Sequence, residues 1–190
     1  MKAILMSIRP QHLVNILNDK KTIELRKKFP SDFRGWVYCY CTKTKPYITQ
    51  QSKSQFTIRE SKDFTNLING KVVCRVWVDN VEEVIANNNY FIGRSSYKTA
   101  TMPESELLNK ACENHEYLYV HMTMFGETEN AIHISELEIF DKPKELGEFW
   151  ADPIDFSIHT KAEAIAEGYH PIARAPQSWQ YVFYPSEVEE

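Results

Sequence analysis

Residues 20–28, Lys-Lys-Thr-Ile-Glu-Leu-Arg-Lys-Lys, decide the fold and follow an apolar helical pattern that begins at Pro10. If residues 22–27 form a strand, consecutive side chains point to opposite faces. Ile23 and Leu25 then enter a core. The opposite face carries Thr22, Glu24 and Arg26. A hydroxyl, a carboxylate and a guanidinium on one surface predict a polar site rather than a packing surface.

Basic and polar side chains on both sides of this strand extend the predicted site. Lys21 lies at the helix-to-strand turn, from which its amine can reach the face of Glu24. Ser7 and Arg9 precede the first helix, where free backbone amides favour an anion. Two alternatives stay open. In the first, Glu24 and Arg26 form either a surface ion pair worth about 0–1 kcal/mol or a recognition site. In the second, Lys21 is either a phosphate contact or a catalytic amine with a lowered pKa.

Composition limits the classes of protein to which the chain can belong. The chain has 190 residues, 43% apolar and 13% aromatic, which supplies a buried core and excludes disorder. A formal charge of −4 leaves only local nucleic-acid binding. Four cysteines without Cys-x-x-Cys spacing, and no apolar run near 18 residues, predict a cytoplasmic protein with reduced thiols and no membrane span. Six scattered histidines lack zinc-ligand spacing, so we expect no metal and no cofactor.

The apolar periodicity predicts mostly strands with a few helices. The predicted strands are residues 3–8, 22–27, 35–42, 71–85, 117–124, 131–140 and 177–184. The predicted helical segments are residues 10–17, 103–112, 142–149 and 161–167, the last ended by Gly168 as a C-cap. The polar segment 43–69 is predicted to be a long loop or a small excursion rather than a core element. This pattern predicts an α+β domain built on a barrel or a strongly curled sheet.

Several of these motifs resemble the ASCH family, a branch of the PUA-like β-barrels, and especially its phage and bacterial members. The resemblance covers nearly the whole chain and rests on residues 7–10, 21–26, 70–79, 131–134, 142–146 and 175–181. It implies an α+β, PUA-like β-barrel with flanking helices, as a single domain over residues 1–190 with insertions at about 43–69 and 147–170. Asp19 stands where the family has a Gly, which predicts a wider turn or a left-handed Asp.

The resemblance also implies a cleft beside the first helix that receives RNA or a modified nucleoside. Some small members are amidohydrolases acting on N4-acetylcytidine, with a Thr nucleophile, a Lys and a Glu, and one member is described as a ribonuclease. Lys21 matches that Lys, and Glu104 is the nearest candidate for the Glu. Glu24 stands in the place of the Thr, where a carboxylate can act as a base on water but not as the hydroxyl nucleophile.

Three functional hypotheses follow. The first is a module that binds RNA or a nucleotide, in which one aromatic residue stacks a base. Its predicted contacts are Ser7, Arg9, Lys21, Thr22, Glu24, Arg26 and Trp179. The second is a hydrolase that uses Lys21 with Glu24 as base, acting on N4-acetylcytidine or on RNA. The third is a phage-derived protein whose insertions bind a host protein partner.

Overall fold

A computed structural model describes residues 3–52, 54–89, 94–125, 127–151 and 161–183. The strands are β1 (Ala3–Ile8), β2 (Ile23–Arg26), β3 (Gly35–Cys41), β4 (Tyr47–Ser52), β5 (Gln55–Arg59), β6 (Val72–Asn89), β7 (Arg94–Lys98), β8 (Glu129–Lys144), β9 (Trp150–Ala151) and β10 (Trp179–Phe183). The helices are α1 (Pro10–Leu17), α2 (Glu104–Ala111), α3 (His115–Leu118) and α4 (Lys161–Ala166), with a π-helical turn η1 (Tyr119–Met124) and a 3₁₀ turn η2 (Leu146–Glu148).

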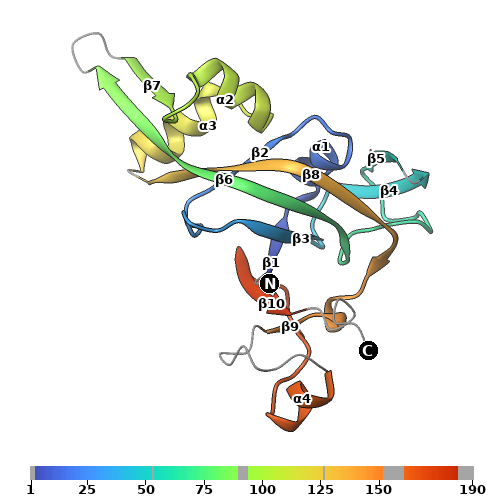
Figure 1. Cartoon of the computed structure of the whole chain (residues 1–190). Coiled ribbons are helices and arrows are strands. Elements are labelled where there is room, and N and C mark those ends of the chain that lie inside the picture. Colours follow the sequence, from blue (N-terminus) through green and yellow to red (C-terminus); the bar gives the residue numbers. More distant parts are fainter. Residues whose placement is uncertain (1–2, 53, 90–93, 126, 152–160, 184–190) are drawn as a thin grey trace.

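A mostly antiparallel sheet forms the centre of the molecule (Figure 1). Its described strands run in the order β2-β8-β6-β3-β1-β10-β9, and β7 pairs with the far end of β6. The pairing of β1 with β3 is parallel, whereas the other pairings along this order are antiparallel. The predicted α+β class with a barrel-type sheet and flanking helices is therefore confirmed.

The central strands are buried on both faces, which explains their continuous apolar sequence. In β1, Ile4 and Met6 enter the main core, whereas Leu5 enters a second core on the other face. In β3, Cys39 lies in the main core and Tyr38 in the second. Side chains of a strand alternate between faces, so a sheet covered on both sides needs apolar residues at every position.

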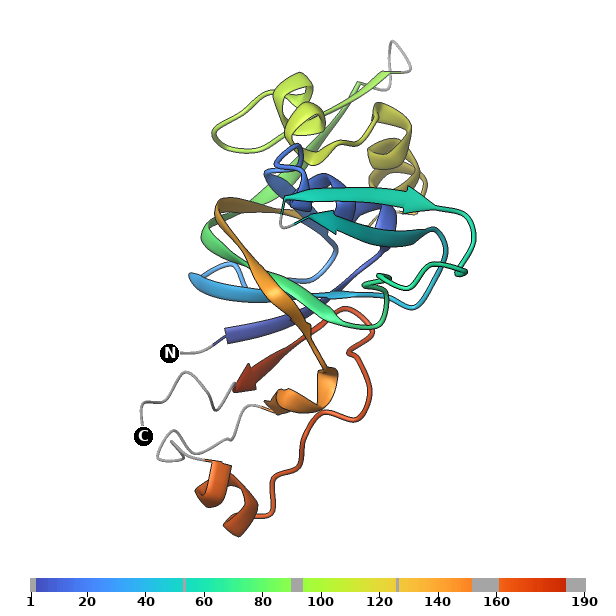
Figure 2. The same ribbon diagram turned by 90° about the vertical axis from the view of Figure 1, so that its right-hand side faces the viewer.

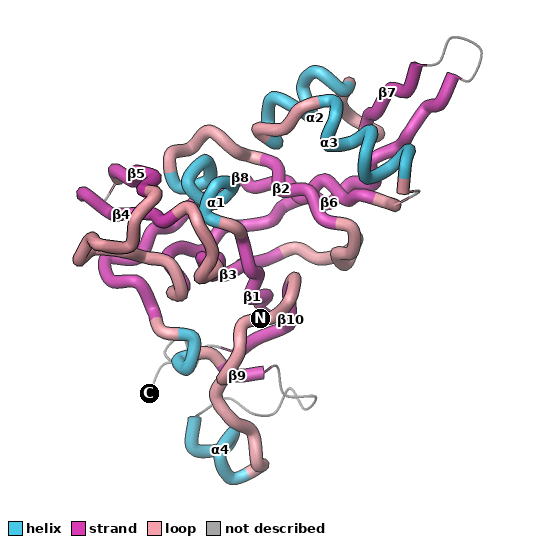
Figure 3. Tube along the Cα trace, turned by 180° about the vertical axis from the view of Figure 1, so that it is seen from behind, coloured by secondary structure: helices cyan, strands magenta, loops and turns pink. Residues whose placement is uncertain are grey.

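Helices α2 and α3 gather beside β7 and the outer end of β6, whereas α4 lies at the opposite end of the molecule (Figure 3). The predicted C-cap of α4 is confirmed, because Gly168 has φ +82°, a left-handed conformation that suits glycine. Residues 152–160 of the predicted insertion at 147–170 lie outside the described part of the chain. No helix in the described ranges combines the length and the apolar character that crossing a membrane requires.

Two predictions of local structure were wrong. Segment 43–69 forms the β4–β5 hairpin, which packs beside α1 (Figure 2), and its Ile48, Phe56 and Ile68 belong to the main core. Three apolar side chains among many polar ones anchor it. Residues 117–124 were predicted as a strand but form α3 and η1. The side chain of Asn114 accepts a hydrogen bond from the backbone N–H of Tyr117 at 3.0 Å and so caps a helical turn.

Candidate functional site

The turn between α1 and β2 positions the first residues of the site. Asp19 has φ +57°, the left-handed conformation expected for an Asp in place of the glycine of the resembling family. The backbone N–H groups of Lys20 and Lys21 both donate to the carbonyl of Asn15, at 2.8 and 3.1 Å. The chain therefore reverses tightly, and β2 starts directly beside the end of the helix.

Strand β2 carries the predicted alternation. Ile23 and Leu25 are buried in a third apolar cluster with residues of α2. On the opposite face, Arg26 Nη2 lies 2.9 Å from Glu24 Oε1, and Lys21 Nζ lies 3.4 Å from Glu24 Oε2. The three charged groups predicted from residues 20–28 are thus in one ion-pair network.

Burial of this network differs along its length. The side chain of Lys21 is 2% exposed and that of Glu24 is 8% exposed, whereas Arg26 reaches 17%. The amine of Lys21 also donates to the carbonyl of Ala111 at the end of α2. Burial by itself raises the pKa of the Glu24 carboxyl, but the charges of Arg26 and Lys21 outweigh it and hold that pKa below its usual value. Glu24 is therefore ionised at neutral pH.

Arg26 also connects β2 to the end of β1. Its Nη2 donates to the carbonyl of Ser7 at 2.8 Å. The hydroxyl of Ser7 donates in turn to the carbonyl of Pro176 at 2.7 Å, and the N–H of Ser7 donates to the carbonyl of Ser178 at 2.9 Å. These bonds draw β2, β1 and the segment before β10 around a single hollow.

This hollow is a cleft of about 560 Å³, within the range of small-molecule sites. Its walls come from β2, the start of α1, the α3–η1 segment and the residues before β10. The lining residues are Ser7, Arg9, His12, Glu24, Leu25, Arg26, Lys27, Lys28, Thr42, Tyr117, His121, Glu129, Gln177 and Ser178. Four of the seven predicted contacts, Ser7, Arg9, Glu24 and Arg26, therefore line one cleft.

The other three predicted contacts lie outside the lining. Lys21 lies beneath Glu24. Thr22 joins the start of β2 to α2 and β8. Its N–H donates to the carbonyl of Lys110, and its carbonyl accepts from the N–H of Ile134, both at 2.9 Å. The indole N–H of Trp179 donates to the carbonyl of Lys28 at 2.6 Å. These bonds hold the three residues outside the cleft lining.

The sequence-based prediction missed the wall formed by α3 and η1. The sequence-based prediction gave Tyr117 and His121 no place in the site. As a helical segment they lie four residues apart on one face, with ring centroids 4.5 Å apart, and both line the cleft. Single π-helical turns are frequent at functional sites. The Asn114 cap was the local signal that indicates a helix here.

Glu129, the first residue of β8, is another lining residue that the prediction missed. It is 0% exposed, and neither carboxylate oxygen has a hydrogen-bond partner among the described residues. Burial raises the pKa of this carboxyl to about 7. Two further buried atoms of the cleft lack a hydrogen bond in the described structure, Glu24 Oε2 and Arg26 Nε. Buried polar atoms without partners are rare in native proteins, and a bound ion, water or ligand is one way in which they are satisfied.

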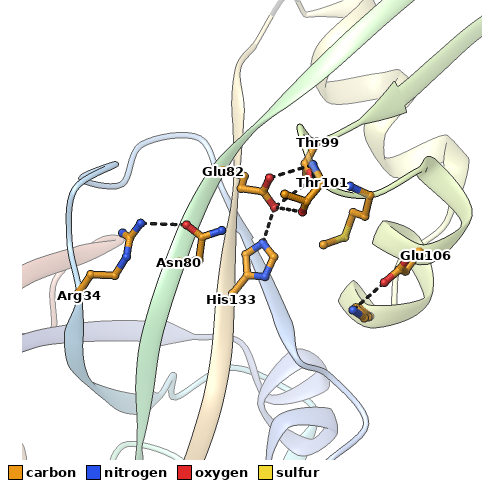
Figure 4. A network of polar contacts seen from close by, with 9 residues as sticks. Arg34, Asn80, Glu82, Thr99, Thr101, Glu106 and His133 are labelled. Atoms are coloured by element: carbon orange, nitrogen blue, oxygen red, sulfur yellow. Dashed lines mark hydrogen bonds and ion pairs between the residues drawn. The ribbon is translucent and has the colours of Figure 1, made fainter.

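A third buried carboxylate, Glu82 of β6, has hydrogen-bond partners for both of its oxygens (Figure 4). Its oxygens accept from the hydroxyl of Thr99 at 3.1 Å and from the hydroxyl and N–H of Thr101 at 2.8 and 3.1 Å. His133 Nε2 of β8 lies 2.8 Å away. These hydrogen bonds tie β6 and β8 to the segment before α2. Because the carboxylate already has partners within the protein, it has little hydrogen-bonding capacity left for a ligand.

Another hollow, of about 460 Å³, lies beside the β4–β5 hairpin. Its lining includes Gln50, Asn66, Lys71 and Asp141. Among the described residues, none that lines it carries a buried side-chain polar atom without a hydrogen bond. The cleft beside β2 is therefore the stronger candidate site.

Comparison with solved structures shows which known proteins share this fold. The ASCH protein of Zymomonas mobilis matches with a TM-score of 0.51 at 14% identity, over 95% of this chain and 87% of that one. Its Y47F mutant matches with a TM-score of 0.52 at 12% identity, over 98% and 94%. The chain has the fold of an ASCH protein. No protein-family model matches the sequence, and no curated protein matches it.

Within this ASCH fold, one group of side chains has the composition of a metal site. One ligand-type atom from each of His121, Glu127 and Glu129 lies within 4.8 Å of the other two. The sequence pattern predicted no metal-ligand group, because these residues do not show a standard spacing. Glu104, the other acidic residue considered for catalysis, pairs with His115 outside the cleft lining.

Proposed function

We propose that the cleft beside β2 binds RNA or a nucleotide. One observation carries the proposal: the cleft combines exposed cations at its rim with buried polar atoms that lack partners at its floor. The rim cations are Arg9, Lys27 and Lys28. A phosphate needs the first kind of group and the edge of a nucleobase needs the second, so one nucleotide has the chemistry to satisfy both.

The floor of the cleft suits a ligand that both donates and accepts hydrogen bonds. Arg26 Nε can donate, whereas the oxygens of Glu129 can accept. Nucleobase edges carry donors and acceptors side by side, and carboxylates accept from exocyclic amino groups. The ring of Tyr117 lines the same cleft and offers a face on which a base can stack.

The small number of rim cations sets the expected salt dependence. With up to three phosphate contacts and about 0.7 released counterions per contact in single strands, a plot of log affinity against log salt has a slope of about −2. The formal net charge of −4 adds no long-range attraction to this local effect. We therefore expect modest affinity with a shallow salt dependence.

Fluorescence anisotropy with labelled short RNA tests the proposal. Arg9→Gln and Lys28→Gln are each expected to weaken binding several-fold and to make the slope shallower by about 0.7. Arg26→Lys keeps the charge but removes Nε, so it is expected to weaken binding without changing the slope. The matched control is Lys142→Gln, which removes an exposed charge outside the cleft lining. Wild-type affinity in all three cleft variants contradicts the proposal.

The contacts give less support to a hydrolase. The Lys21 amine is occupied by Glu24 and the Ala111 carbonyl, and Lys21 does not line the cleft. Glu24 in turn is held by two cations, which makes it a weak base. Hydrolysis by Lys21 and Glu24, like the host protein partner expected for the insertions, therefore stays a sequence-based prediction.

A further inference from the structure

We propose that His121, Glu127 and Glu129 bind a divalent transition-metal ion of the Mn²⁺ or Zn²⁺ kind at the wall of the cleft. One ligand-type atom of each lies within 4.8 Å of the others, and His121 Nδ1 lies 2.9 Å from Glu127 Oε2. Metal–ligand bonds to imidazole nitrogen and carboxylate oxygen are about 2.0–2.2 Å long. Small side-chain movements therefore bring all three atoms into one coordination sphere.

Glu129 provides the independent observation that points to a cation. Its side chain is fully buried, it lines the cleft, and neither oxygen has a hydrogen-bond donor among the described residues. A buried carboxylate without a donor or a cation is costly, because desolvation is not compensated. A metal ion bound between Glu129 and His121 supplies that compensation.

The nearby protein cations compensate the Glu129 carboxylate only in part. Lys27 Nζ contacts Glu127 Oε1 at 2.5 Å, and its side chain is 51% exposed. Arg26 directs its Nη2 to Glu24 and to the carbonyl of Ser7. Neither side chain forms a hydrogen bond with Glu129 in the described structure, so both cations act on the buried carboxylate only from a distance.

Local structure favours the three residues acting together. The N–H of Glu127 donates to the carbonyl of His121 at 3.0 Å, which ties the end of η1 to the start of β8. Glu129 is held in the sheet by its pairing with Val84 of β6. The ligands thus come from a closed local segment anchored to the sheet, and not from independent loops.

The donor set selects the class of ion. Imidazole suits zinc, iron, nickel and copper, whereas carboxylates suit magnesium, calcium and manganese. Mg²⁺ prefers oxygen ligands and keeps several waters. One His with two Glu therefore favours a first-row transition metal over Mg²⁺ or Ca²⁺, and three protein ligands leave positions open for water or a ligand in the cleft.

Titration of tag-free, chelator-treated protein with Mn²⁺, followed by the electron paramagnetic resonance signal of free Mn²⁺, tests the inference. We expect saturable binding of one ion per chain, displaced by Zn²⁺ and not by an equal concentration of Mg²⁺. Glu129→Gln and His121→Gln are each expected to weaken Mn²⁺ binding at least ten-fold. The matched control is Glu104→Gln, which alters a similar His–Glu pair outside the cleft and is expected to leave binding unchanged.

Either of two results overturns the inference: no saturable Mn²⁺ binding to the wild type, or wild-type affinity in the variants of Glu129 and His121. Circular dichroism shows whether each variant is folded. The His121 side chain is 29% exposed, so His121→Gln decides the question if Glu129→Gln does not fold. The measurement contains no RNA, so its failure leaves the proposed RNA binding standing, and loss of RNA binding leaves the metal result intact.

Discussion

Replacing Lys21 by Met tests whether this lysine is a buried support of the site or a ligand contact. Met keeps most of the length of the side chain and removes the amine. The change deletes the ion pair with Glu24 at 3.4 Å and the hydrogen bond to the Ala111 carbonyl. Both partners lie in buried surroundings, because the side chains of Lys21 and Glu24 are 2% and 8% exposed. The substitution therefore affects the folded state directly.

The expected loss of stability follows from these two contacts. Breaking a buried ion pair by removing one partner costs about 3–5 kcal/mol. Arg26 remains 2.9 Å from Glu24 and still compensates its charge, which brings the cost to the lower end of this range. The Ala111 carbonyl loses a donor, worth about 1–3 kcal/mol, while the Met side chain recovers packing. We expect a net loss of about 3 kcal/mol, or about 6–12 °C in Tm for a chain of this size.

Urea unfolding followed by tryptophan fluorescence measures the loss. The control is Lys20→Met, which removes the adjacent lysine, an exposed one, and is expected to change stability by less than about 0.5 kcal/mol. A loss in Lys21→Met below about 1 kcal/mol, or one equal to that of the control, refutes the buried-support argument. Loss of RNA binding with unchanged stability would instead make Lys21 a ligand contact.

Two further predictions concern the framework around the site. Burial raises the pKa of Glu82, but hydrogen bonds from Thr101 and Thr99 outweigh it and hold that pKa below its usual 4.5. The free energy of unfolding that Glu82 contributes is therefore fully present above pH 4.5 and is lost as pH falls through the lower pKa of the folded state. We expect urea unfolding to show that acid lowers the stability of Glu82→Gln less than it lowers the stability of the wild type. Asp19 has a left-handed backbone conformation, so Asp19→Ala is expected to lower the free energy of unfolding by about 1 kcal/mol in the same assay. Asp19→Gly is expected to cause no such loss, and equal losses in the two variants contradict the prediction.

Periodicity in the sequence was sufficient for the elements that build the cleft floor. The helical spacing after Pro10 predicted α1, and alternation over residues 22–27 predicted which face of β2 carries Glu24 and Arg26. Backbone geometry sets both patterns locally, so no distant residue is needed to infer them. The same motif led to the ASCH fold, although the matching structures share only 12–14% of their residues with this chain.

The sequence-based prediction was wrong where a few buried side chains determine the structure of a segment that is polar on average. Segment 43–69 is mostly polar, but Ile48, Phe56 and Ile68 bury it against the main core. Residues 117–124 alternate apolar and polar side chains like a strand. The cap at Asn114 and the burial of Leu118 against α2 make them helical instead. Tertiary packing commonly overrides weak local preference in this way.

The sequence by itself determined the barrel-type class, the faces of β2 and the identity of the charged groups at the site. Only the tertiary structure decided their roles. Lys21 is held away from the cleft because its amine donates to the carbonyl of Ala111, 90 residues away. Glu129 belongs to the cleft because β8 pairs beside β2 and no donor reaches its carboxylate among the described residues. Whether a side chain is buried and has a partner depends on segments that are distant along the chain. The spacing of residues in a local stretch of sequence therefore cannot predict either property.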